Sequence, residues 1–188
     1  MDSAVDDLVQ LVGAPPHPAG SAPVDDPRWS AIEYRLDLEF PPDYKQLIAA
    51  FGTSTWGGFL NVLNPFSRLD ALHLERAGYR MLGTVHGVRR QEPEAVPYGV
   101  FPEKCGLFPW AITDNGDALF WLTEGPSSWW STVILEARGP ECERHALTAS
   151  AVIYEFLRAK LQSPLLLDPF RGNCPPTRWR NPESQSTG

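Results

Sequence analysis

Residues 40–65 read FPPDYKQLIAAFGTSTWGGFLNVLNP and carry the clearest structural pattern in the chain. Two prolines open this stretch, and because proline has a fixed φ and no amide donor, it suits the first turn of a helix. Asp43 follows in the same turn, where a carboxylate interacts favourably with the positive end of the helix dipole. The stretch is therefore expected to begin as a helix.

The apolar residues that follow lie on one side of this predicted helix. They are spaced at i, i+3, i+4 and i+7, which forms a single stripe. Gly52 then occupies the position of a left-handed C-terminal cap. Residues 56–64 are expected to form one extended segment that stops at Asn64-Pro65. The stripe consists of Tyr44, Leu47, Ile48 and Phe51.

The length and composition indicate a globular domain with an acidic surface. The chain has 188 residues, of which 43% are hydrophobic, and this is enough to bury a core. Its formal net charge is −7. Because nucleic acids and anionic lipids repel such a surface, neither is expected as the main partner. A basic protein partner is compatible with this charge.

Three features of the sequence predict a cytoplasmic protein. No segment approaches 18 consecutive apolar residues, so no transmembrane helix is expected. The N-terminus carries Asp2, Asp6 and Asp7 where a signal peptide would carry lysine or arginine. The cysteines are odd in number and widely spaced, which favours free thiols in a reducing compartment. They are Cys105, Cys142 and Cys174.

The composition divides the chain into three parts. Residues 1–26 form an N-terminal extension, with a short acidic helix over 2–12 followed by a Pro-rich linker. Residues 27–163 hold the periodic segments and form the expected domain. Residues 164–188 contain five prolines and a polar end, and this tail is expected to be mobile.

The first half of the domain is predicted to be mainly helical. A helix over residues 27–36 places its apolar residues on one face. A further helix is expected to begin near Ser67, which would act as its N-cap. Three glycines interrupt the later pattern and are expected to break this helix. They are Gly78, Gly83 and Gly87.

The second half changes to the alternation of a sheet. Residues 107–113 and 117–123 flank Asp114-Asn115-Gly116, and because an Asn-Gly pair tolerates positive φ, the pattern predicts a hairpin. The expected fold is α+β, with the N-terminal helices and a closing helix packed on one face of a curled, mostly antiparallel sheet. Further strands and the closing helix are expected over residues 98–101, 132–138, 143–147 and 148–161.

No pattern of catalytic or metal-binding residues stands out. The chain has no G-x-S-x-G elbow, no phosphate-binding G-x-x-x-x-G-K-[ST] loop and no G-x-G-x-x-G after a strand. Its four histidines lie in separate segments without the spacing of a metal helix. Residues 114–117 resemble part of a calcium loop but have too few carboxylates, and a hairpin turn explains them better. Neither an enzyme nor a cofactor or metal is expected.

Trp129 and Trp130 are adjacent, which gives them different expected environments. Neighbouring strand residues point to opposite faces of a sheet, so both cannot be buried against one layer unless a loop or bulge intervenes. The simpler interpretation of the tryptophans in this region is that they form core. The alternative is that one of this pair is exposed and anchors an interface, a role that tryptophan often fills.

Four motifs follow one another along the chain: WSAIE at 29–33, FPPDYKQLI at 40–48, FGTSTWGGFL at 51–60, and FPWAITDNGD at 108–117 with LFW at 119–121. In this order they resemble the SMI1/KNR4 (SUKH) superfamily. The resemblance covers about residues 27–161, and the segments before and after lie outside it. One departure is Leu38-Glu39-Phe40, where members of the superfamily more often have a glycine and a leucine.

This resemblance implies a binding module with no shared catalytic residues. Bacterial members are mostly immunity proteins that neutralise a cognate polymorphic or contact-dependent toxin, often a nuclease, whereas eukaryotic relatives regulate cell-wall synthesis. The leading hypothesis is therefore a cytoplasmic immunity protein with a protein toxin as partner and no small-molecule ligand. The alternative is a regulatory or scaffolding protein without a toxin.

The surface that would contact the toxin is predicted from charge and aromatic character. Carboxylates around the central hairpin would face a basic partner, and adjacent tryptophans would serve as apolar anchors. A competing hypothesis places the contacts on the acidic N-terminal helix. The predicted contact residues are Asp114, Asp117, Glu124, Trp129 and Trp130.

Overall fold

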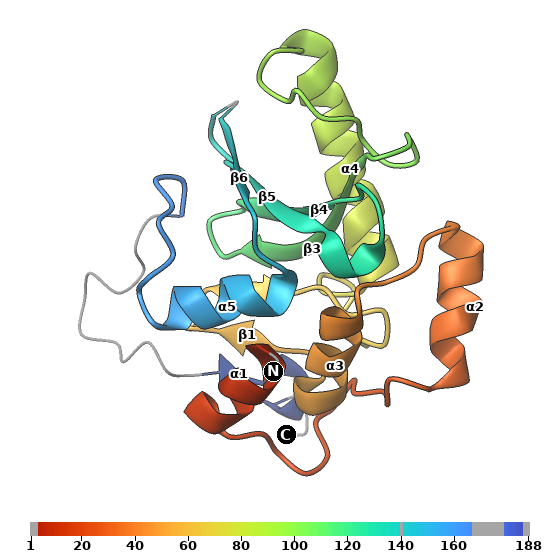
Figure 1. Cartoon of the computed structure of the whole chain (residues 1–188), viewed down its shortest axis with the longest axis vertical. Helices are drawn as coiled ribbons and strands as arrows, with labels where there is room; N and C mark the ends of the chain where they lie inside the picture. The colour runs from red at the N-terminus through yellow and green to blue at the C-terminus, as the bar shows by residue number, and fades with distance from the viewer. Residues whose placement is uncertain (1–3, 140, 167–178, 186–188) are drawn as a thin grey trace.

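The computed structural model describes residues 4–139, 141–166 and 179–185, which form an α+β fold (Figure 1). This part of the chain holds five α-helices and a seven-stranded antiparallel sheet, so the predicted fold class is confirmed. The helices are α1 Ala4–Val12, α2 Pro27–Leu36, α3 Pro42–Phe51, α4 Leu74–Gln91 and α5 Ala149–Leu157. The strands are β1 Thr55–Trp56, β2 Leu60–Val62, β3 Leu107–Thr113, β4 Ala118–Leu122, β5 Ser131–Leu135, β6 Cys142–His145 and β7 Trp179–Arg180.

The sheet is open, and its strand order is β6-β5-β4-β3-β2-β1-β7. All strands except β7 therefore follow the order of the chain. The C-terminal segment returns to pair β7 with β1 in antiparallel register, Thr55 opposite Arg180 and Trp56 opposite Trp179. The tail was expected to be mobile, but residues 179–185 contribute this edge strand and the short 3₁₀ helix η2 Pro182–Gln185. Residues 167–178 of the predicted tail lie outside the described residues.

The predicted central hairpin is present with the expected turn. β3 matches the predicted 107–113 segment, and the amide of Thr113 donates to the carbonyl of Asp117 across 2.8 Å. Gly116 has a φ of 94°, which lies in the region that favours glycine. The Asn-Gly signal therefore identified the turn correctly.

The segment over residues 56–64 is a hairpin and not the single extended segment that was expected. β1 and β2 pair antiparallel, with Trp56 opposite Leu60. Gly57 and Gly58 have φ values of 59° and 66°, and the amide of Phe59 donates to the carbonyl of Trp56 across 3.0 Å. Two consecutive residues with positive φ form the tight turn of a hairpin, and two glycines adopt it without steric cost.

The helix that was expected to break at its glycines is continuous. α4 runs for 18 residues and begins at Leu74, not at Ser67. A glycine inside a helix costs about 1 kcal/mol relative to alanine, so tertiary packing must offset this cost. At Gly78 an added Cβ would lie 3.3 Å from Pro109 Cγ, so this glycine lets α4 approach β3 closely. Of the strand expected over 98–101, only Val100 forms a bridge, to Leu107.

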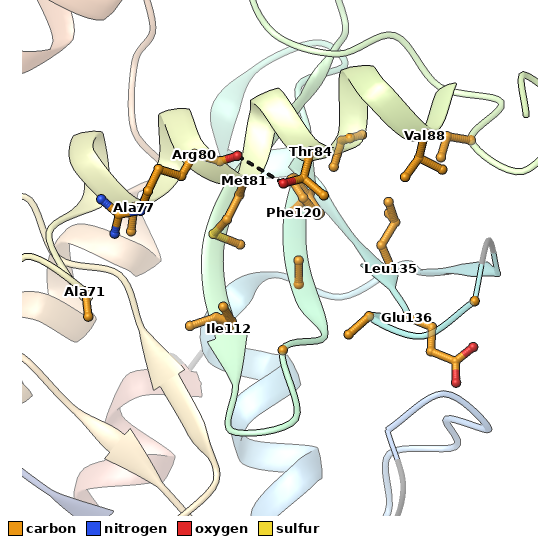
Figure 2. Close-up of a pocket in the computed structure, with 16 residues that line it drawn as sticks. Ala71, Ala77, Arg80, Met81, Thr84, Val88, Ile112, Phe120, Leu135 and Glu136 are labelled. Carbon is orange, nitrogen blue, oxygen red and sulfur yellow. Dashed lines mark hydrogen bonds between the residues drawn. The ribbon is translucent and has the colours of Figure 1, made fainter. Parts of the chain in front are cut away.

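Helices cover both faces of the sheet, whereas the sequence suggested one face (Figure 1). Trp121 on β4 lies 4.8 Å from Tyr44 of α3, measured between ring centroids. The preceding residue, Phe120, points to the other face and lines a pocket under α4 (Figure 2). α1, α3 and α5 pack together on the Trp121 face, and α4 packs on β3 from the opposite side.

The N-terminal extension contributes to the same core as the rest of the fold. In α1, Val5 and Leu8 are buried, and the helix packs against α3 and α5. An aromatic cluster fills the centre of this core, with edge contacts from Trp29 to Phe40 and Tyr44. Because each aromatic side chain buries about 150–250 Å², this cluster is a main source of stability.

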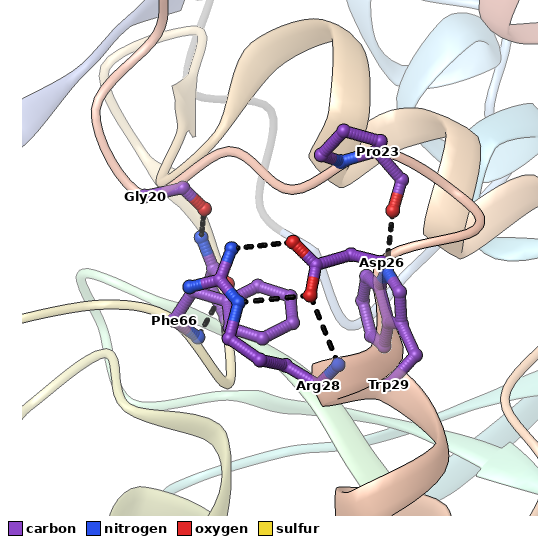
Figure 3. Close-up of polar contacts among 7 residues, drawn as sticks. Gly20, Pro23, Asp26, Arg28, Trp29 and Phe66 are labelled. Atoms are coloured by element: carbon purple, nitrogen blue, oxygen red, sulfur yellow. Dashed lines mark hydrogen bonds and ion pairs between the residues drawn. The ribbon is translucent and has the colours of Figure 1, made fainter.

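Polar contacts hold the linker before α2 against the body of the protein (Figure 3). Asp26 caps α2 by accepting a hydrogen bond from the amide of Arg28 across 2.9 Å, and its carboxylate also pairs with the Arg28 guanidinium at 2.8 Å. These hydrogen bonds from Arg28 lower the pKa of Asp26 from 3.8 to about 2. The Arg28 guanidinium in turn lies 4.5 Å above the ring of Phe66.

Two further hydrogen bonds fix the linker backbone. The indole Nε1 of Trp29 donates to the carbonyl of Pro23 across 2.9 Å. The side-chain Nδ2 of Asn64 donates to the carbonyl of Gly20 across 2.8 Å. The Asn64-Pro65 pair that ends the opening stretch therefore also holds the linker.

Candidate functional site

The loop after β4 carries the most exposed tryptophan in the described part of the chain. Trp129 ends the short 3₁₀ helix η1 Ser127–Trp129 and is 78% exposed. Trp130, in contrast, is 7% exposed, and its ring lies 6.1 Å from that of Trp121. The alternative interpretation, in which one member of this pair is exposed, is therefore correct for Trp129, although this residue lies in a 3₁₀ helix and not on a strand. Its role at an interface stays a prediction.

The backbone around Trp129 is held in place by local hydrogen bonds. The amide of Trp129 donates to the carbonyl of Pro126 across 2.9 Å. The indole of Trp130 donates to the carbonyl of Gly125 across 3.1 Å. Because the buried neighbour anchors the turn, the exposed indole is presented from an ordered backbone.

An ion pair lies beside this turn. Glu124 Oε2 and Arg144 Nη2 are 3.2 Å apart, and both side chains are about half exposed. Arg144 Nε also donates to Ser131 Oγ across 2.9 Å, which fixes the guanidinium above β5. An exposed pair of this kind adds little stability. It does place a negative and a positive side chain beside the turn that carries the exposed Trp129. Glu124, Trp129 and Arg144 are called the Trp129 surface below.

Asp117, which was predicted as a surface contact, is buried instead. Its side chain is 4% exposed. One carboxylate oxygen accepts a hydrogen bond from Thr113 Oγ1 across 2.9 Å, and the other accepts from the amide of Ala137 across 3.1 Å. The carboxylate thus joins the central hairpin to the end of β5. This structural role explains its position and removes it from the candidate contacts.

The predicted contact residues do not form one continuous surface. Asp114 is exposed at the turn between β3 and β4, where its Oδ1 accepts from Asn61 Nδ2 across 2.8 Å. Glu124 and Trp129 follow the other end of β4. A strand rises about 3.3 Å per residue, so the five residues of β4 separate these two groups by roughly 17 Å.

A second exposed aromatic group was missed by the sequence reasoning. Tyr34 on α2 is 91% exposed and Tyr79 on α4 is 55% exposed. The two helices are joined by a bidentate pair in which Arg35 donates to both oxygens of Glu75 at 2.8 and 2.7 Å. Helical spacing was the available signal, because Tyr34 lies off the stripe formed by the buried residues of α2.

The described residues provide no assembled metal site. Within them, no group of three or more histidine, cysteine, aspartate or glutamate side chains is placed to hold an ion. Cys105 and Cys142 are free thiols, and burial raises the pKa of Cys142. No helix in the part of the chain that the structure describes is both long and apolar enough to cross a membrane.

The fold and this surface define an α+β protein with an open antiparallel sheet and an exposed tryptophan on an ordered turn. No family model, curated protein or solved structure matches the chain. The resemblance to the SUKH superfamily therefore depends on the four sequence motifs alone.

Proposed function

We propose that this chain is a cytoplasmic immunity protein that binds and neutralises a cognate protein toxin. The exposure of Trp129 is the observation that supports this proposal most directly. A large aromatic side chain on an ordered turn gains free energy when a partner covers it, and tryptophan is enriched among residues that dominate binding energy. The SUKH-like motifs add the expectation that the partner is a toxin.

The charge of the protein supports a basic partner. The chain carries a formal charge of −7, so its field attracts a cationic protein such as a nuclease and accelerates encounter. Glu124 in the Trp129 surface would contact basic side chains at the rim, while Trp129 would fill an apolar pocket of the toxin. Inhibition then follows when the bound protein covers the substrate groove of the toxin.

Co-expression with the product of the gene directly upstream tests the proposed function. The expected result is that this product is toxic alone and harmless when the present chain is made with it. A purified complex then allows affinity to be measured by calorimetry. If no neighbouring product is toxic, or if the chain does not relieve the toxicity, the proposed function is wrong.

A matched pair of variants locates the interface. Trp129→Ala is expected to weaken toxin binding about thirtyfold or more, because loss of a central tryptophan typically costs about 2 kcal/mol or more. Tyr34→Ala removes an equally exposed aromatic residue elsewhere and should leave affinity unchanged. The opposite pattern would place the interface on the α2 side while leaving the immunity function intact.

The second candidate function is a regulatory or scaffolding protein. The exposed Tyr34 and Tyr79 support it, because a scaffold needs more than one binding surface and these side chains belong to α2 and α4, not to the turn that carries Trp129. In that case the chain would bind two proteins at once and would not relieve toxicity. The co-expression experiment separates the two functions.

A further inference from the structure

A pocket of about 460 Å³ lies between α4 and the face of the sheet that α4 covers (Figure 2). Its volume falls within the range of about 300–1,000 Å³ that is typical of small-molecule sites. Most of its lining is aliphatic or aromatic. Its apolar lining includes Met81, Val88, Ile112, Ala118, Phe120 and Leu135.

The pocket exists because α4 and the sheet do not pack tightly against each other in this region. Met81 and Val88 of α4 and Ile112 and Ala118 of the sheet are all only partly buried, although they pack against the core. Protein interiors are normally packed without voids larger than a water molecule. Small side chains such as Ala77 and Ala118 leave this space unfilled, so apolar surface stays available to a ligand.

One end of the pocket carries an excess of positive charge. Arg80 Nη2 donates to the backbone carbonyl of Asp70 across 3.2 Å, and no other hydrogen bond of its guanidinium is seen within the described residues. The carboxylate of Asp70 pairs with the neighbouring Arg76. Arg76 thus pairs with the Asp70 carboxylate, whereas Arg80 has no carboxylate partner among the described residues, so its guanidinium is available to an anionic ligand.

The other polar groups of the lining do not compete for such a ligand. Glu136 lies at the opposite end, and its carboxylate points away from Met81 and Ile112 (Figure 2). The hydroxyl of Thr84 donates its hydrogen to the carbonyl of Arg80 across 3.3 Å, so this hydrogen is not available to a ligand. Arg80 is therefore the group in the lining that is best placed to recognise a charged head.

We propose that this pocket binds a small aliphatic carboxylate. The chain of the ligand would lie along Met81, Ile112 and Phe120, and its carboxylate would accept hydrogen bonds from Arg80. A docking helix fits less well, because one turn that is about 10 Å wide and 5.4 Å long already occupies roughly 400 Å³. The site lies on the sheet face opposite α3, whereas η1 contacts α3, so it is independent of the Trp129 surface.

Titration of the full chain with sodium dodecanoate, below its micelle-forming concentration, tests this proposal. The expected result is saturable binding by calorimetry and amide shift changes that centre on α4, β3 and β4. Dodecanol has the same chain without the charge and is expected to bind more weakly than dodecanoate. Absence of saturable dodecanoate binding, or shift changes centred elsewhere, would overturn the proposal.

Two variants separate the charge from the cavity. Arg80→Gln should weaken dodecanoate binding about tenfold, the scale of a lost charge-assisted hydrogen bond, and leave dodecanol binding unchanged. Arg90→Gln, an exposed change on the same helix outside the lining, is the matched control. Ala118→Phe should block both ligands. If this variant does not fold, the shift map of the natural protein and the Arg80 comparison still decide the question.

Discussion

The phenol of Tyr44 donates a hydrogen bond to the backbone carbonyl of Leu63 across 2.5 Å. Both residues are fully buried. Burial raises the pKa of Tyr44 well above its usual value, so the phenol remains a protonated donor at any physiological pH. This contact joins α3 to the chain after β2 and connects the two halves of the best-patterned sequence stretch.

Tyr44→Phe is therefore expected to lower the free energy of unfolding by about 1–3 kcal/mol, because a buried carbonyl loses its donor. Urea denaturation followed by circular dichroism measures this change. Tyr34→Phe removes the same hydroxyl from a side chain that is 91% exposed, and a shift within about 0.5 kcal/mol is expected. Equal stability of Tyr44→Phe and the natural protein would contradict the role assigned to this bond.

Gly52 provides a second test, because a close approach and a positive φ coincide there. Its φ is 62°, and an added Cβ would lie 2.2 Å from the carbonyl oxygen of Ala19. The same carbonyl accepts hydrogen bonds from the amide of Thr53 at 3.0 Å and from Asn181 Nδ2 at 2.8 Å. The N-terminal linker, the end of α3 and the C-terminal segment all meet at this oxygen.

Gly52→Ala should therefore destabilise the protein much more than a positive φ alone would. Gly13→Ala is the reference variant, since Gly13 also has a positive φ, of 72°, but nothing within 4 Å of an added Cβ. Gly52 differs from the left-handed cap that was expected, because its ψ is −141°, and this conformation is nearly confined to glycine and adds to the cost of the contact. Gly13→Ala is expected to cost about 1–2 kcal/mol, whereas Gly52→Ala should cost at least twice as much. Thermal unfolding of the two variants measures the difference. Similar midpoints would show that the contact with Ala19 is easily relaxed.

Local sequence patterns predicted the elements of this fold better than their pairing. The helical stripe of α3 and the Asn-Gly turn between β3 and β4 depend on neighbouring residues, and both were identified. The turn at Gly57-Gly58 was overlooked although Gly-Gly is a hairpin signal, because the strands on either side have only two and three residues and show no alternation of their own. α4 was misjudged because Gly78 is explained by its contact with Pro109, which no local pattern contains.

The candidate site was predictable to a smaller degree. The adjacency of Trp129 and Trp130 suggested that one of them is exposed, but the strand geometry behind this prediction was wrong, because Trp129 ends a 3₁₀ helix and does not lie on a strand. The burial of Asp117 could not be predicted, because its partner Ala137 lies in the segment after β5 and is 20 residues away. The pocket under α4 could not be predicted from local patterns either, since Met81 and Phe120 line it together but lie far apart in the sequence.

Glu183 connects the C-terminal segment to two loops of the domain. Its Oε1 accepts hydrogen bonds from Thr53 Oγ1 at 2.5 Å, Ser67 Oγ at 2.8 Å and the amide of Arg68 at 3.2 Å. Because Thr53 and Ser67 are buried, Glu183→Ala leaves both hydroxyls without this acceptor, and a loss of about 2 kcal/mol or more is expected.

Urea denaturation of Glu183→Ala measures this loss, and the exposed Glu94→Ala is its control. The control removes the same carboxylate from the surface and should change stability by less than about 0.5 kcal/mol. If the two variants were equally stable, the C-terminal segment would contribute nothing to the fold through this oxygen.

His73 makes the stability of the protein depend on pH. Burial is the main cause that lowers its pKa from 6.5, and within the described residues its Nδ1 is buried without a hydrogen-bond partner. Just below pH 6.5 the imidazole of His73 is therefore protonated in the unfolded chain but still neutral in the folded protein. The contribution of His73 to stability is complete above pH 6.5 and is lost as the pH falls through that value towards the folded pKa.

The free energy of unfolding should accordingly fall between pH 7.5 and pH 5.5, and His73→Gln should reduce this slope. Denaturation curves at several pH values measure both slopes. The titration of Glu75 does not contribute to these slopes, because the hydrogen bond from Arg35 lowers the pKa of Glu75 from 4.5 and its effect on stability begins at lower pH. The same is true of Asp26, with its pKa of about 2. An unchanged slope in His73→Gln would assign the pH dependence to another group.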